Sequence, residues 1–385
     1  VPLEALAGRR LARDLRARVD NPAFTNSAMD GYAVRVADVA TAAEATPVQL
    51  PVVGDVPAGA RPVYTVQPGM SVRIMTGAAV PPGAEAVVPL EWTDGGLATV
   101  TVAQAPTPGA NIRRQGEDVK AGEVVLEAGT RLGPGQVGLL AAIGRDRVMV
   151  RPRPRVVIIS TGSELVEPGT RPEPGQIHES NSYLLTTAVR EAGAMAFRVG
   201  IVPDDDRALM DAIEDQLIRA DLVLTSGGVS VGAYDVVKEV LSRLGTVTFD
   251  TVAMQPGKPQ GFGTVGPDNT PIITLPGNPV SSYVSFEVFV RPVIRRMLGV
   301  EPLHRPVVRA ECEAPMHSPA GRRQYARAWL DVKGGRYVVR PVGGAGSHLV
   351  GDLAHATALM VVPRPVRVVP EGGTVDVMVL ERRAL

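Results

Sequence analysis

Several residue types are scarce in this chain of 385 residues, and each scarcity excludes a class of site. The single cysteine, Cys312, excludes an intramolecular disulfide and a cysteine-based zinc site, and it fits a reducing, cytoplasmic setting. The five histidines, at positions 178, 304, 317, 348 and 355, show neither HxxxH nor HExxH spacing. A histidine metal site or a His-based triad would therefore need residues from distant parts of the sequence.

An excess of charge and a long apolar run are missing as well. The 40 basic residues balance the 40 acidic ones, so no overall field favours nucleic acid or an anionic membrane, and a charged ligand must be held by local clusters. No apolar run approaches the ~20 residues that span a bilayer, and the N-terminus lacks the pattern of a secretion signal. We expect a soluble, cytoplasmic protein that binds neither nucleic acid nor membrane.

Lysine is the rarer of the two basic residues. Of the 40 basic residues only four are lysines, and the other 36 are arginines. Lys258 lies in QPGKPQGFG, where prolines and glycines restrict the backbone, and a compact ammonium at such a place suits an oxyanion. We favour this functional interpretation over a solvated surface lysine.

The segment 225–235, TSGGVSVGAYD, follows a short apolar run and contains almost no bulky side chains. Its glycines can take positive φ and let backbone N–H groups approach a ligand, while its serines add hydroxyl donors. This pattern indicates an anion cradle suited to a phosphate, formed by Ser226, Gly227, Gly228, Ser230 and Gly232, with Asp235 at its end. An ordinary strand-to-helix turn explains the pattern as well, because the segment is neither GxGxxG nor GxxxxGK[ST].

Residues 155–300 alternate short β-branched runs with helical stretches, which predicts a parallel sheet covered by helices on both faces. Ligands of open α/β sheets bind beyond the carboxyl ends of the strands, so STGSE, PDDD, TSGGVSVGAYD and LPGNPVS should border one crevice. Asn278 is the expected N-cap of the last helix, with Pro279 at its first position. The predicted strands are 155–159, 197–202, 222–224 and 272–275, and the predicted helices are 181–191, 206–219, 236–244 and 280–298.

The flanking regions have a different character. Residues 1–150 show short strands, prolines and Gly turns typical of β-rich modules, with a helix expected over 3–15, and RPRPR at 151–155 resembles a stiff linker. After about residue 303 the β alternation returns, with a hairpin at Lys333-Gly334-Gly335 and strands near 337–342, 358–362 and 374–380. The fold class is therefore multidomain α/β plus β: a central doubly wound α/β domain, β-rich N-terminal modules and a small C-terminal β-barrel.

Two further segments, NSAMDGYAV at 26–34 and NIRRQGED at 111–118, mix acids, glycine and hydrogen-bond donors. Together with RIMTGAAVP, STGSEL, SGGVSVGAYD, PGKPQGFG and LPGNPVS, in this order, they resemble the molybdopterin molybdenumtransferase family, MoeA and the gephyrin E domain. Taken alone, Asp30-Gly31 would be a plain turn, and Arg113 with Arg114 would form surface ion pairs with Glu117 and Asp118.

The resemblance implies insertion of molybdate into adenylylated molybdopterin, with release of AMP, formation of molybdenum cofactor and a need for Mg²⁺. It also implies a homodimer, and as further partners the molybdopterin adenylyltransferase and molybdoenzyme apoproteins. On this basis we assign 1–20 and 112–150 to a discontinuous linker and dimerisation domain, 21–111 to a β-rich module inserted in it, 151–300 to the molybdopterin-binding domain and 301–385 to the barrel.

Residue roles follow from the same resemblance. The implied catalytic residues are Asp30, Asp118, Glu164, Asp235 and Lys258, of which Asp235 and Glu164 would hold Mg²⁺. The implied substrate-binding residues, beyond those of the cradle, are Thr76, Arg113, Asp205, Pro259, Pro276, Gly277, Asn278, Ser281, Arg322 and Ser347. Lys258, Pro259 and Ser281, with Arg322 and Ser347 from the C-terminal domain, resemble the molybdate pocket of the family.

The chain departs from the family pattern at two positions. Gln255 replaces the first lysine of KPGKP, and Thr25 replaces the first residue of DNSAMD. Loss of a cation should weaken anion binding, unless Arg322 or Arg323 compensates, which is our hypothesis. Two other functions stay open: a gephyrin-like scaffold that binds partner peptides or molybdopterin without catalysis, and the enzyme of the neighbouring adenylyl-transfer step.

Overall fold

The computed structural model describes residues 1–61, 63–227 and 234–380. The chain divides into two compact units, Val1–Arg151 (unit 1) and Pro152–Leu385 (unit 2), and each is described by itself. No helix in these ranges is both long enough and apolar enough to cross a membrane.

The β-rich part of unit 1 is a five-stranded sheet in the order β6-β3-β5-β4-β7. Both faces of the sheet are buried, because Tyr32 and Val34 contact one apolar cluster and Ala33, between them, contacts another. The strands are β3 (Gly31–Val34), β4 (Val48–Val56), β5 (Ser71–Ile74), β6 (Ala86–Pro89) and β7 (Thr99–Val102), with 3₁₀ turns η2 (Val36–Val39) and η3 (Leu90–Trp92).

A second core of unit 1 is drawn from both ends of its sequence. Leu6, Leu11 and Leu15 pack against Leu140 and Ile143 of the later segment. The elements around this core are η1 (Leu3–Ala5), β1 (Leu15–Arg16), which pairs with β9 (Val124–Leu126), and α1 (Pro134–Ala142). A short pair, β2 (Asn26–Ser27) with β8 (Ile112–Arg113), lies where the chain enters and leaves the inserted sheet.

The helix predicted over 3–15 is wrong: only η1 is helical there. Gly8 takes a left-handed φ of 73° and ends the turn. The N–H groups of Gly8 and Leu11 then donate to the carbonyls of Leu132 and Thr130, so that this segment runs alongside a distant one. Tertiary hydrogen bonds here override a helical apolar spacing.

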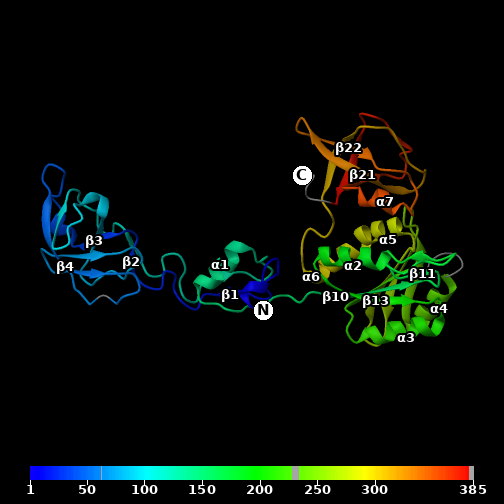
Figure 1. Ribbon diagram of the computed structural model, residues 1–385, viewed down its shortest axis with the longest axis horizontal. Coiled ribbons are helices and arrows are strands. Elements are labelled where there is room, and N and C mark those ends of the chain that lie inside the picture. The colour runs from blue at the N-terminus through cyan, green and yellow to red at the C-terminus, as the bar shows by residue number, and fades with distance from the viewer. Residues whose placement is uncertain (62, 228–233, 381–385) are drawn as a thin grey trace. The chain divides into compact units, whose positions relative to one another are not determined.

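The α/β part of unit 2 is a six-stranded sheet in the order β13-β10-β14-β18-β17-β15, with α2 and α5 on one face and α3 and α4 on the other (Figure 1). Val156 and Ile158 face the α2 side, and Val157 and Ile159 face the other, which gives the doubly wound core. Its elements are β10 (Arg155–Thr161), α2 (Asn181–Ala192), β13 (Met195–Val202), α3 (Asp206–Leu217), β14 (Leu222–Ser226), α4 (Tyr234–Leu244), β15 (Gly245–Thr251), β17 (Pro259–Val265) and β18 (Thr270–Leu275).

All the strands and helices predicted in this part are present, but the sheet is not wholly parallel. β17 and β15 pair antiparallel at one edge, where the glycine-rich sequence of β17 gave no strand pattern. The last predicted helix is continuous in sequence but consists of α5 (Pro279–Ser285), the π-helical turn η4 (Phe286–Val290) and α6 (Arg291–Leu298).

The C-terminal strands form the predicted barrel, closed by the pairing of β21 with β23. Gly334 and Gly335 both take positive φ and make the two-residue turn between β21 and β22. Tyr325 and Met378 of the barrel pack with Val280 and Val284 of α5. The barrel strands are β19 (Val307–Cys312), β21 (Arg323–Lys333), β22 (Arg336–Pro341), β23 (Ala358–Val362) and β25 (Thr374–Val379).

The remaining elements of unit 2 are short. They are the parallel pair β11 (Leu165–Val166) and β12 (Ile177–His178), the pair β20 (Met316–His317) and β24 (Val368–Val369), the helix α7 (Val350–Ala354) and β16 (Met254–Gln255), which adds to barrel strand β21.

Candidate active site

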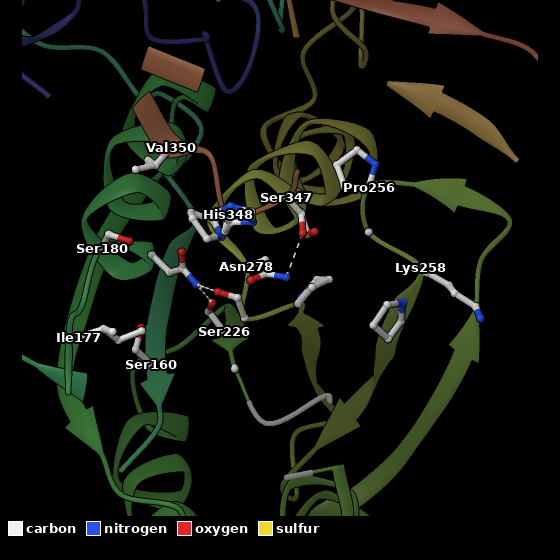
Figure 2. Close-up of a pocket in the computed structure, with 18 of the residues that line it drawn as sticks. Ser160, Ile177, Ser180, Ser226, Pro256, Lys258, Asn278, Ser347, His348 and Val350 are labelled. Atoms are coloured by element: carbon white, nitrogen blue, oxygen red, sulfur yellow. Dashed lines mark hydrogen bonds between the residues drawn. The ribbon is translucent and has the colours of Figure 1, made fainter. Parts of the chain in front are cut away.

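A cavity of about 710 Å³ lies in unit 2 beyond the carboxyl ends of β10, β14 and β18. Loops of the α/β domain form most of its wall, and two loops of the barrel complete it. The predicted site residues that line it are Glu164, Ser226, Gly227, Lys258, Pro259, Pro276, Gly277, Asn278, Ser281, Arg322 and Ser347. Figure 2 shows part of this wall.

Three of the four loops predicted to border one crevice contribute to the wall, and PDDD does not. In that loop the backbone N–H of Asp204 donates to the hydroxyl of Ser163 at 3.2 Å, which holds PDDD beside STGSE. The carboxylate of Asp205 accepts the N–H of Ala208 at 2.9 Å and caps α3. In the structure, Asp205 is therefore the N-cap of α3, a position where aspartate is common.

The predicted anion cradle begins with Gly227, where the backbone conformation and the lack of space for a side chain favour glycine. Gly227 has a φ of 100°, and a Cβ built there would lie 2.4 Å from the carbonyl oxygen of Thr161. The backbone thus passes close to β10 at the edge of the cavity. Three predicted cradle residues lie outside the described residues, namely Gly228, Ser230 and Gly232, and the same holds for the side chain of Asp235 in the first turn of α4.

The loop that carries Lys258 is held by a buried glutamine. Gln260 donates through Nε2 to the carbonyl of Gly257 at 2.7 Å and to the hydroxyl of Ser285 at 2.6 Å. Gly257 needs its positive φ of 95°, and a Cβ there would lie 2.6 Å from Oγ of Ser285. Lys258 itself is exposed, and its side chain extends away from Ser226 and Asn278 (Figure 2).

Gln255 lies between this loop and the barrel. Its strand β16 pairs with β21, so that Gln255 is the register partner of Gln324, and Arg323 donates its N–H to Ala253. Gln255 and Arg322 line the same cavity.

Asn278 and Ser347 join the two parts of unit 2 across the cavity. The Nδ2 of Asn278 donates to Oγ of Ser347 at 2.9 Å, and the N–H of Val280 donates to the carbonyl of Ser347 at 3.1 Å (Figure 2). Asn278 does occupy the N-cap position before Pro279, as predicted, but its side chain makes no capping hydrogen bond. The contact with the barrel uses the side chain instead.

Glu179 and Asn181 are among the wall residues that sequence reasoning missed. Glu179 is buried and accepts hydrogen bonds from Ser160 Oγ at 2.9 Å and from the N–H and Oγ of Ser182 at 2.8 and 2.5 Å. Asn181 donates to Ser226 and to the carbonyl of Gly277. The polar run ESNS at 179–182, which includes the first two residues of α2, was a usable signal, but it does not follow a strand of the main sheet.

The other predicted residues belong to unit 1. Asp30 accepts hydrogen bonds from the N–H of Thr76 at 2.6 Å and from its hydroxyl at 2.8 Å. These two bonds, the backbone one first, lower the pKa of Asp30 below its usual 3.8. Asp118 accepts from Nδ2 of Asn21 at 2.8 Å, and Arg113 lies in β8. Asp30 and Thr76 thus form a pair that the sequence could only suggest separately.

Comparison with known proteins bears on the whole chain. Residues 1–144 match the model of the MoeA N-terminal region (domain I and II), residues 157–296 that of a probable molybdopterin binding domain, and residues 309–380 that of the MoeA C-terminal region (domain IV). The chain belongs to the MoeA family. The two MoeA models cover the β-rich modules and the barrel, and the model of a probable molybdopterin binding domain covers the α/β domain, in the order that the resemblance of the motifs implied.

Relatives of this MoeA chain are similar over most of their length. Molybdopterin molybdenumtransferase 2 of Mycobacterium tuberculosis is 48% identical over 383 residues, 98% of this chain and 94% of that protein. Molybdopterin molybdenumtransferase of Bacillus subtilis is 36% identical, over 99% of this chain and 89% of that protein. A crystal structure of the molybdopterin biosynthesis MoeA protein from Pyrococcus horikoshii has a TM-score of 0.84 at 33% identity and covers 99% of this chain and 94% of that one.

Proposed function

We propose that this chain inserts molybdate into adenylylated molybdopterin, releasing AMP and molybdenum cofactor. The observation that carries the proposal is the convergence of predicted residues from three strand-end loops and from the barrel on one cavity of about 710 Å³. Pockets with a few convergent polar groups are the usual places of small-molecule binding and catalysis.

The wall of the cavity offers different groups at different places. Ser226 and Gly227, at the end of β14, suit the phosphate groups of the substrate. Lys258, Ser281 and Arg322 supply donors for molybdate, and each charge-assisted hydrogen bond to such an oxyanion contributes roughly 1.5 to 3 kcal/mol. We propose that Arg322 replaces the cation lost at Gln255.

A Mg²⁺ ion fits the part of the cavity near Glu164. Glu164 is exposed and lines the cavity, and Mg²⁺ commonly binds through one or two carboxylates together with substrate phosphates. The described residues, which leave out the side chain of Asp235, contain no cluster of three or more His, Cys, Asp and Glu side chains that could hold a metal ion. In the proposed site, oxygens of the substrate phosphates and of water would complete the coordination. Glu164, with Asp235, would hold the ion, which would offset charge on the phosphates.

We also propose a homodimer acting in a reducing compartment such as the cytoplasm, where the free, buried Cys312 would stay reduced. The predicted residues Asp30, Thr76, Arg113 and Asp118 all belong to unit 1, whereas unit 2 lines the cavity. In the proposed dimer, unit 1 of a second copy supplies these four residues: Asp30 and Thr76 from its β-rich module, and Arg113 and Asp118 from the segment that follows it. The molybdopterin adenylyltransferase would provide the substrate, and molybdoenzyme apoproteins would receive the product.

Two observations weigh against the other functions. A scaffold that only binds partner peptides has no need of Lys258, Arg322 and Glu164 in the wall of this cavity. An enzyme of the adenylyl-transfer step would need only the α/β domain, but here Arg322 and Ser347 of the barrel form part of the wall.

The test is release of AMP from adenylylated molybdopterin by the purified chain, with and without molybdate and Mg²⁺. We expect release to require both, and to be lost in Lys258→Ala and Asp235→Ala variants that keep the melting temperature of the wild type. Binding of molybdopterin without turnover in the wild type would support the scaffold, and ATP-dependent adenylylation of molybdopterin by this chain would support the adenylyl-transfer enzyme.

A further inference from the structure

Two serines of the cavity wall form a matched pair. Ser160 is the residue before the last one of β10, Ser226 is the last residue of β14, and the two are register partners in the parallel sheet. Both line the cavity, and each is only 2% exposed. Position and burial therefore do not distinguish them, and a difference in function must come from their hydrogen bonds.

Glu179 accepts a hydrogen bond from the hydroxyl of Ser160. The Oε1 atom of Glu179 lies 2.9 Å from Ser160 Oγ and also accepts the backbone N–H of Ser182 at 2.8 Å. An oxygen that accepts a backbone N–H acts as an acceptor, so Ser160 is the donor in this pair. The hydroxyl of Ser160 then has lone pairs, but no proton, to offer to the cavity.

Asn181 donates a hydrogen bond to Ser226, so that the Ser226 hydroxyl accepts where the Ser160 hydroxyl donates. Its Nδ2 lies 2.6 Å from the carbonyl oxygen of Gly277, and a carbonyl can only accept, which fixes the amide nitrogen on this side. The same nitrogen lies 2.7 Å from Ser226 Oγ, so Ser226 accepts from Asn181. Within the described residues no acceptor takes the proton of Ser226, whose Oγ takes part only in this one hydrogen bond.

We propose that Asn181 is a positioning residue that makes the Ser226 hydroxyl a hydrogen-bond donor to a tetrahedral oxyanion of the substrate. The inference rests on the proposed function and specifies which group at the end of β14 contacts the anion. Gly227, the next residue, must be glycine for the chain to pass Thr161, so the oxyanion would meet the Ser226 hydroxyl beside a backbone without a side chain. The oxyanion is a phosphate group or molybdate, which share this chemistry.

The experiment measures the dissociation constants of AMP and of molybdate separately, by titration calorimetry, for the wild type and four variants. We expect Ser226→Ala and Asn181→Ala each to weaken binding of one of the two probes about 10-fold or more, the effect of losing a hydrogen bond to a charged group. The double variant should bind no more than about twofold more weakly than Ser226→Ala, because Asn181 acts through Ser226. Asn181→Asp, of equal size, should weaken binding at least as much, since a carboxylate would take the proton of Ser226.

Two further variants serve as controls. Ser160→Ala should lower the melting temperature, because it removes a donor from buried Glu179, and leave both dissociation constants within about twofold. Thr187→Ala, on an exposed part of α2, should change neither.

A loss confined to AMP binding would identify the anion as phosphate, and a loss confined to molybdate binding would identify it as molybdate. Three results would overturn the inference. The first is a dissociation constant of the double variant raised by the product of the two single effects. The others are equal losses of affinity in Ser160→Ala and Ser226→Ala, and a wild type that binds neither probe. AMP release by the wild type, measured alongside, separates failure of this inference from failure of the proposed function.

Discussion

Nδ2 of Asn278 lies 2.9 Å from Oγ of Ser347, and this hydrogen bond connects a strand-end loop of the α/β domain with a loop of the barrel at the cavity. A neutral hydrogen bond contributes about 0.5 to 1.5 kcal/mol, which is about 2- to 12-fold in an equilibrium or rate constant. The bond is therefore strong enough to influence how often both loops hold the positions that the cavity requires.

Asn278→Ala and Ser347→Ala are expected to lower kcat/KM for AMP release by about 3- to 10-fold each, with a small change in melting temperature, since Asn278 is exposed. The double variant should be less impaired than the product of the two single effects predicts. A coupling energy of zero in this cycle would show that the two residues act separately.

Gly227→Ala is expected to destabilise the chain by more than about 2 kcal/mol, since left-handed backbone alone costs a non-glycine residue about 1 to 2 kcal/mol. The added Cβ would also lie 2.4 Å from the carbonyl oxygen of Thr161. Chemical unfolding of unit 2 measures the loss, and Gly277→Ala serves as the control, because the closest atom to its Cβ would be 3.6 Å away. Equal stability of the two variants would contradict the structure at Gly227.

Substitutions of Asp205 test whether its carboxylate only caps α3 or also binds substrate. Asp205→Ala should cost about 1 kcal/mol of stability through loss of the cap of α3, whereas Asp205→Ser keeps a capping oxygen and should restore most of it. If capping is the whole role, both variants keep the wild-type KM for adenylylated molybdopterin. A raised KM in Asp205→Ser at full stability would instead show that the carboxylate contacts substrate.

The stability of unit 1 should depend on pH through Asp30. Its pKa is lowered in the folded state by the hydrogen bonds from Thr76, so the carboxylate adds stability above the ordinary value of 3.8, and this stability is lost as pH falls through the folded pKa. The urea midpoint of unit 1 should therefore fall less steeply below pH 4 in Asp30→Asn than in the wild type. Parallel curves for the two proteins would argue against the Asp30–Thr76 bonds.

Gln255→Lys tests whether an arginine compensates for the missing cation. We expect the molybdate dependence of AMP release to stay unchanged in this variant, and to weaken about 10-fold in Arg322→Ala. The combination Gln255→Lys with Arg322→Ala should recover part of the loss, because both residues line the same cavity. A large gain of rate in Gln255→Lys alone would show that no compensation exists.

The sequence by itself determined the elements of the α/β domain, the hairpin at Gly334-Gly335, the order of the motifs and, through them, the family. These features depend on local rules: alternation of apolar residues, turn glycines and strand-end loops. The rule that ligands bind beyond the carboxyl ends of the strands also brought most of the cavity residues together before the structure did.

The tertiary structure alone decided which partner each polar side chain takes. Asn278 binds Ser347 of the barrel, Asp205 caps its own helix, and Asn181, which the sequence did not single out, holds Ser226. Long-range hydrogen bonds also replaced the expected N-terminal helix, and a glycine-rich strand joined the sheet antiparallel. Propensity acts over a few neighbouring residues, whereas a hydrogen bond between residues 69 positions apart, such as that of Asn278 with Ser347, exists only once the chain has folded.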